Sequence, residues 1–80
     1  MLMEYVRAAM RQARYETLSD DDSFYGEISV CHGVHANDVS LERCKAVLEE
    51  VLEEWILFRI HLNLDLPVID GLEIKIREVA

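Results

Sequence analysis

Basic residues are scarce in this sequence, which carries 8 lysine and arginine side chains against 16 aspartate and glutamate side chains, for a formal charge of -8. This charge repels the phosphate backbone of nucleic acids, so we expect no direct nucleic-acid binding by this chain alone. No stretch approaches the roughly 18 consecutive apolar residues of a membrane span. We therefore expect a cytoplasmic protein without a membrane partner, for which a basic protein surface is the natural complement.

Cysteine is also rare, because Cys31 and Cys44 are the only two in the chain. Two distant cysteines do not make the disulfide framework of a small secreted domain, so we expect free thiols in a reducing compartment. The 80 residues allow one domain, 1–80. A domain of this size buries only about 60% of its unfolded surface, so we expect association into a homo-oligomer, a dimer or a tetramer, to add to the core.

The pattern of apolar residues predicts an α+β fold in the order α-β-β-β-α-β. The predicted elements are a short helix over 2–12, strands over 13–18, 24–30 and 34–37, a long helix over 41–62, and a strand over 72–77. Ser40 is a favourable N-cap for the long helix, and Asn63 can adopt the left-handed conformation that closes it. We expect two layers, an antiparallel three-stranded meander plus one further strand, with the helices on one face.

The long predicted helix has more apolar residues than one sheet covers. One stripe is predicted to lie on the sheet, namely Leu41, Cys44, Leu48, Val51, Trp55, Phe58 and Leu62. A second set makes the latter half of the helix apolar nearly all round. Its members are candidates for an oligomer interface: Val47, Leu52, Ile56 and Ile60. Either the short first helix or a second copy of the chain, or both, should cover this set.

Three motifs together resemble HicB-family antitoxins of type II toxin-antitoxin systems. They are the hairpin Tyr15-Glu-Thr-Leu…Phe24-Tyr-Gly-Glu-Ile28, the run Gly33-Val-His-Ala-Asn37, and Ser40-Leu-Glu-Arg-Cys44 leading into an acidic, Leu-rich body. The resemblance covers residues 13–72. It implies a partial ribonuclease-H-like domain that self-associates and that binds and neutralises a small basic HicA-like toxin, which cleaves RNA.

The end of the chain departs from the family pattern. Such antitoxins usually carry a DNA-binding segment after this domain, whereas this chain ends at Ala80. We therefore regard it as a short form and expect no operator binding unless another chain supplies that segment.

Two groups of acidic residues could dock a basic toxin. The first group belongs to the predicted hairpin and comprises Asp20, Asp21, Asp22 and Glu27. The second group lies on the long helix and comprises Glu49, Glu50, Glu53 and Glu54. A solvated surface of an acidic protein is the alternative interpretation, and the sequence does not rank the two groups. Tyr25, on the polar side of its strand, could also anchor a partner.

Catalysis is not expected. Three consecutive aspartates in a turn do not supply the convergent ligands on rigid elements that a metal-dependent nuclease needs. Cys31, His32 and His35 offer zinc-ligand atoms, but they lack the paired spacing of a zinc knuckle, so we expect a structural loop without metal or cofactor. The alternatives to a non-catalytic antitoxin are a stand-alone oligomeric adaptor and a small metal-binding regulator that uses these three side chains.

Overall fold

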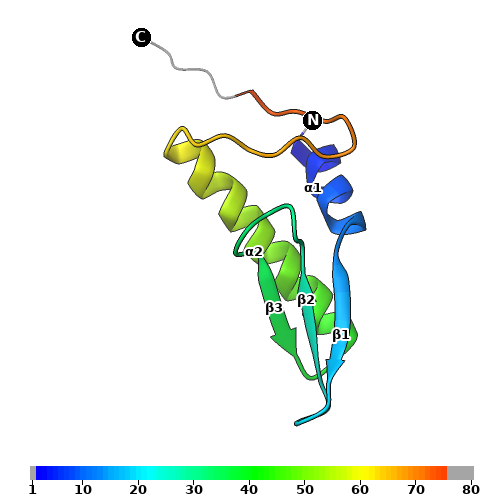
Figure 1. Cartoon of the computed structure of the whole chain (residues 1–80). Helices are drawn as coiled ribbons and strands as arrows, with labels where there is room; N and C mark the ends of the chain where they lie inside the picture. The colour runs from blue at the N-terminus through cyan, green and yellow to red at the C-terminus, as the bar shows by residue number, and fades with distance from the viewer. Residues whose placement is uncertain (1, 76–80) are drawn as a thin grey trace.

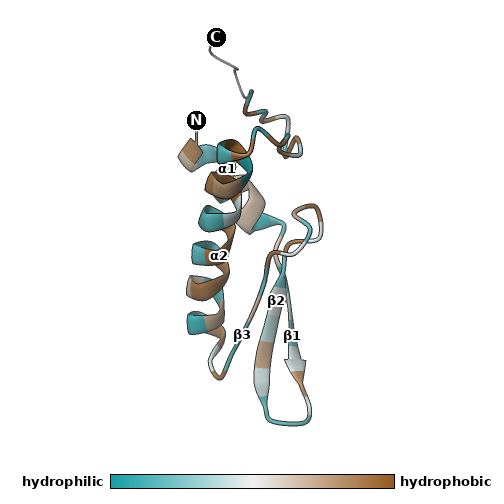
Figure 2. Ribbon diagram, turned by 90° about the vertical axis from the view of Figure 1, so that its left-hand side faces the viewer, coloured by the Kyte–Doolittle hydropathy of each residue, from teal (hydrophilic) through white to brown (hydrophobic). Residues whose placement is uncertain are grey.

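Two layers, a three-stranded antiparallel sheet and a long helix lying on one of its faces, form the body of the structure (Figures 1 and 2). The computed structural model describes residues 2–75. Its elements are α1 (Leu2–Arg11), β1 (Arg14–Leu18), β2 (Ser23–Glu27), β3 (His35–Asp38) and α2 (Leu41–His61). The predicted α+β fold is thus confirmed, in the order α-β-β-β-α.

Helix α2 begins and ends at the residues expected from its capping signals. The Ser40 hydroxyl accepts a hydrogen bond of 3.1 Å from the backbone N–H of Arg43, which satisfies one of the unpaired amides of the first turn. Asn63 follows the last turn with a φ of 56°. The next residue, Leu64, donates its N–H to the carbonyl of Arg59 at 2.8 Å, which closes the helix.

The sheet and α2 approach each other closely at Gly26. This residue pairs with Tyr15 of β1 and Ala36 of β3, and it faces Cys44 of α2. A Cβ atom at Gly26 would lie 2.8 Å from carbon atoms of the Tyr15 ring and 3.3 Å from the Cys44 sulfur. The absence of a side chain therefore allows a ring from the edge strand to pack over the central strand beside the helix.

The second half of α2 extends beyond the sheet and is covered by other parts of the chain. Leu52 and Ile56 are 0% and 1% exposed, packed in one core with Tyr5 of α1 and Ile69. The buried positions on α2 are Cys44, Leu48, Leu52 and Ile56. A spacing of four residues turns about 40° further round the helix at each step, so the buried face rotates from the sheet toward α1.

This rotation corrects the predicted sheet-facing stripe. Phe58 and Leu62 were expected on the sheet but are 60% and 48% exposed, because they lie on the side of α2 away from α1, where the sheet has ended. Leu52 and Ile56, expected at an oligomer interface, belong to the core of the single chain. The short first helix therefore supplies part of the cover that the surplus apolar residues require.

The segment after α2 crosses the end of the molecule and reaches α1 (Figure 1). The Tyr5 hydroxyl donates a hydrogen bond to the carbonyl of Pro67 at 2.5 Å. The Arg59 side chain donates two bonds, of 2.9 and 2.6 Å, to the carbonyl of Asp65. These contacts hold the segment over the otherwise open end of the core.

The last predicted strand, 72–77, is not formed in the part that the structure describes. The expected turn at Asp70-Gly71 is present, with φ values of 50° and 75°. It folds Leu72 back onto Ile69 as an isolated bridge, and residues 73–75 join no strand. Local pairing across the turn therefore takes the place of pairing with the sheet; residues 76 and 77 lie outside the described residues.

Substitution Gly26→Ala tests the close approach of sheet and helix. The added methyl group must displace the Tyr15 ring, so we expect the free energy of unfolding to fall by about 1–3 kcal/mol. Urea denaturation followed by Trp55 fluorescence measures this change. In a Tyr15→Ala background the same substitution should cost clearly less, because the ring contact is already gone. An equal cost in both backgrounds would contradict this packing.

Candidate partner-binding surface

The three aspartates of the first acidic group form the exposed tip of the β1–β2 hairpin. One Asp21 carboxylate oxygen accepts hydrogen bonds from the Ser23 hydroxyl at 2.6 Å and from its backbone N–H at 3.1 Å. These bonds lower the pKa of the Asp21 carboxyl below its usual value. Asp22 adopts a left-handed φ of 55°. Asp21 and Asp22 thus build the turn itself, and Asp20 extends the acidic tip.

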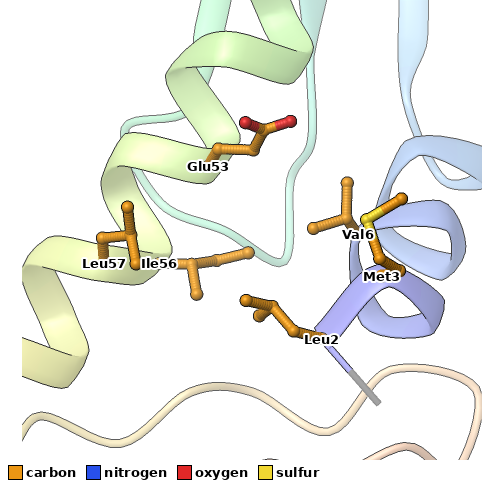
Figure 3. Close-up of a pocket in the computed structure, with 6 residues that line it drawn as sticks. All are labelled: Leu2, Met3, Val6, Glu53, Ile56 and Leu57. Carbon is orange, nitrogen blue, oxygen red and sulfur yellow. The ribbon is translucent and has the colours of Figure 1, made fainter.

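The four glutamates of the second acidic group divide between two sides of α2. Glu49 lines a hollow together with three basic residues, Arg7, Arg11 and Lys45. Glu53 stands at the edge of an apolar groove of about 160 Å³ between α1 and α2, which Figure 3 shows. The negative charge on this side of the helix is therefore partly balanced by basic side chains of the same chain.

The other two glutamates face a different direction. Helical geometry places Glu50 and Glu54 about 100° round the axis from Glu49 and Glu53. Both are exposed. The four acids that the sequence grouped together are consequently two pairs, and only one pair is remote from α1.

A third acidic surface lies on the sheet, on the face that α2 does not cover. Strand alternation and register bring Glu16 of β1 directly opposite Tyr25 of β2, and Glu27 lies two residues further along β2 on the same side. The Tyr25 hydroxyl donates a hydrogen bond of 3.2 Å to a Glu27 carboxylate oxygen. On the other side of Tyr25, the His35 ring of β3 stacks at 6.1 Å between ring centres. In the edge-on view of Figure 2, the described chain leaves this face open.

The electrostatic environment of Tyr25 reflects these neighbours. Desolvation raises the pKa of the Tyr25 hydroxyl. The negative charge of Glu27, its hydrogen bond with the hydroxyl, and the negative charge of Glu16 raise this pKa further. Glu27 was a predicted candidate, whereas Glu16 was not. The position of Glu16 follows from the register of the hairpin. The sequence does contain a signal for this register, because apolar and polar residues alternate on both sides of the aspartate turn, and that alternation would have allowed us to pair Glu16 with Tyr25.

The predicted interface residues occupy two kinds of environment. Leu52 and Ile56 are buried within the chain, as described above, and Val47 and Ile60 are half-buried against the core. The apolar side chains that α2 does expose on its second half are Leu57, Phe58 and Leu62. These three residues, and not Leu52 and Ile56, are accessible to another chain.

The cysteine and histidine loop between β2 and β3 is closed by its own backbone. Ile28 donates its N–H to Val34 at 3.2 Å, and Val34 donates to Cys31 at 3.0 Å. The Cys31 side chain points into the core, while His32 and His35 are exposed. Across residues 2–75, no three histidine, cysteine or acidic side chains converge closely enough to hold a metal ion.

Comparison with known proteins identifies a family and a solved structure of the same fold. A family model described as UPF0150-like matches residues 4–67. The chain belongs to the UPF0150-like family. It is also similar to the crystal structure of TTHA0281 from Thermus thermophilus, with 36% sequence identity and a TM-score of 0.88. The match covers 96% of this chain and 95% of that one, and no curated protein matches.

The UPF0150-like match spans all five helices and strands almost completely, because it begins within α1 and ends after α2. It therefore includes both the uncovered sheet face and the hairpin tip. None of the helices in residues 2–75 combines the length and apolar character needed to cross a membrane.

Both thiols of the UPF0150-like fold are buried, and this predicts a loss of stability at high pH. Burial raises the pKa of the Cys31 thiol from 9.0 to about 11, against the opposing charge of Arg59. Between these values the folded chain keeps a proton that the unfolded chain has lost. The stabilisation is therefore complete below about pH 9 and is lost as the pH rises toward 11.

Urea unfolding measured between about pH 8 and pH 10.5 should show this decrease, on the order of 1 kcal/mol from Cys31. The Cys31→Ala variant serves as the control, because it removes the titrating group and should make the decline shallower. Parallel declines in the two proteins would show that another group is responsible.

Proposed function

We propose that this UPF0150-like chain is a non-catalytic, HicB-like antitoxin that binds and neutralises a small basic RNA-cleaving toxin. The observation that carries the proposal is the uncovered face of the sheet, where Glu16 and Glu27 flank Tyr25 and the aspartate tip continues the acidic surface. The motifs that resemble HicB-family antitoxins include these same strands.

The chemistry of the partner supports this pairing. A protein that cleaves RNA must bind phosphates, and it does so with arginine and lysine side chains. An acidic surface attached to a rigid sheet competes for those side chains and excludes RNA from them. The charge of -8 also accelerates encounter with a basic protein and disfavours acidic ones.

The positions of the reactive side chains support a binding role over a catalytic one. The acids at the hairpin tip are exposed and engaged in their own turn, as the Asp21 hydrogen bonds illustrate. The thiols of Cys31 and Cys44 are buried, and burial raises the pKa of each, which opposes formation of a nucleophilic thiolate at neutral pH.

Co-expression with any small basic protein encoded beside this chain's gene tests the proposal. That protein alone should arrest growth, co-expression of this chain should restore it, and the two should purify as a complex. The association rate should fall at least about tenfold between low salt and about 0.5 M salt, because steering by charge is screened. An unrelated protein of equal size and charge is the control. Growth arrest that persists despite co-expression would refute the antitoxin assignment.

Self-association is a second part of the proposal, with its interface at the exposed end of α2. We expect the double substitution Phe58→Glu with Leu62→Glu to yield monomers, because both side chains are exposed and lie one turn apart. Val39→Glu with Val68→Glu is the matched control, because both of these apolar side chains are exposed and neither lies on α2. Light scattering at tens of micromolar gives the mass. A monomeric parent protein, or an unchanged mass in the α2 variant, would contradict this interface.

A further inference from the structure

The Tyr25 ring lies at the centre of the uncovered sheet face, with Glu16 beside it on β1 and Glu27 two residues further along β2. We propose that this ring and the carboxylates of Glu16 and Glu27 form a receptor for an arginine side chain of the partner. The guanidinium group lies over the ring and donates hydrogen bonds to the two carboxylates. This inference rests on the proposed function and specifies which group of the basic partner is bound, and where.

The geometry of the strands brings the three groups together. Glu16 and Tyr25 are direct partners across β1 and β2, so their Cβ atoms lie about 4.5–5.5 Å apart. Glu27 is tied to the Tyr25 hydroxyl by the 3.2 Å hydrogen bond. The three side chains line one open hollow of about 230 Å³ with Arg14 and Tyr15. A planar group entering this hollow meets a ring face and two acceptors.

Two other aromatic rings, those of Trp55 and Tyr15, are already occupied by cations of the chain itself. The Arg59 guanidinium lies 5.1 Å from the centre of the Trp55 ring, and the Lys45 ammonium lies 5.5 Å from that of Tyr15. In residues 2–75, no such cation lies over Tyr25. Tyr25 is thus an aromatic ring in an acidic setting that remains available to a cation from outside.

The charged neighbours leave the carboxylates accessible. Arg14 lies opposite Glu27 in the register and lines the same hollow, and His35 stacks on the far side of Tyr25. Within the described residues, Arg14 forms no ion pair with Glu16 or Glu27. The face therefore presents two carboxylates against one permanent cation.

Geometry and charge favour arginine over lysine as the bound side chain. They also favour this sheet face over the other acidic residues as the binding site. A guanidinium group stacks on an aromatic plane and forks toward two carboxylates, whereas an ammonium group does neither as well. Glu49 shares its hollow with three cations of the chain, and Glu50 and Glu54 are exposed on the outer side of α2, away from Tyr25. Asp21 is engaged in its turn.

Binding of a nona-arginine peptide to the full chain tests the receptor, with nona-lysine as the chemical control. We expect arginine to bind at least about threefold more tightly than lysine, and amide resonances of β2 to shift on titration. The variant Glu16→Gln with Glu27→Gln should weaken nona-arginine binding at least about tenfold. The matched variant Glu50→Gln with Glu54→Gln removes the same charge elsewhere and should change the affinity less than about twofold.

Substitutions at Tyr25 separate the ring from the carboxylates. Tyr25→Leu should lose several-fold in affinity and most of the preference for arginine, whereas Tyr25→Phe should retain the preference. Because Tyr25 is half-buried, thermal melting checks that each variant is folded. The glutamine variants alter exposed residues, so they test the receptor even if a Tyr25 variant fails to fold. Equal effects of the two glutamine pairs, or equal binding of the two peptides, would overturn the receptor.

The toxin experiment then distinguishes this inference from the antitoxin proposal. If the neighbouring gene product binds the parent and the Glu16→Gln with Glu27→Gln variant equally, the receptor is wrong and the antitoxin assignment stands. If nona-arginine binds at this face as described but no neighbouring protein binds, the receptor stands and the antitoxin assignment is wrong.

Discussion

The structure depends on a mismatch in length between α2 and the sheet on which it lies. The helix has 21 residues and the strands have 4 or 5. At about 1.5 Å per helical residue and about 3.3 Å per strand residue, the helix is nearly twice as long as the sheet. Its free half must be buried by something else, and α1 and the segment around Ile69 serve this purpose. The positions of α1 and of the segment around Ile69 therefore follow from the need to bury the apolar residues of α2.

As a result, the elements that pack against the sheet all lie on one of its two faces. Both helices and the final segment contribute to a single core, so the opposite face of β1, β2 and β3 remains in contact with solvent. Because strand residues alternate between faces, the polar set of each strand gathers there, with Tyr25 at its centre. The sheet face that we propose as the partner-binding surface is therefore exposed because the core forms only on the opposite face.

Local signals in the sequence predicted the local features well. Ser40 and Asn63 marked the ends of α2, and the alternation on both sides of the aspartate turn marked the β1–β2 hairpin. The buried face of α2 was predicted correctly at Cys44 and Leu48, whereas Leu41, Phe58 and Leu62 of the predicted stripe are exposed. Beyond Leu48 apolar residues lie on more than one side of the helix. Burial of Leu52 instead of Phe58 is determined by the distant α1, which no local pattern records. Glu16 was missed because no register was assigned to the hairpin strands, although their alternation around the aspartate turn would have paired it with Tyr25.

The hydrogen bond between Tyr5 and Pro67 joins residues 62 positions apart in the chain. During synthesis on a ribosome, this contact forms only after Pro67 has left the exit tunnel. Helix α1, the hairpin and the first turns of α2 emerge earlier, but the apolar end of α2 is only partly covered until the closing segment has been made. The core is therefore closed only after the segment around Pro67 has been synthesised. In the interval before closure, the exposed end of α2 is most open to aggregation or to capture by another chain.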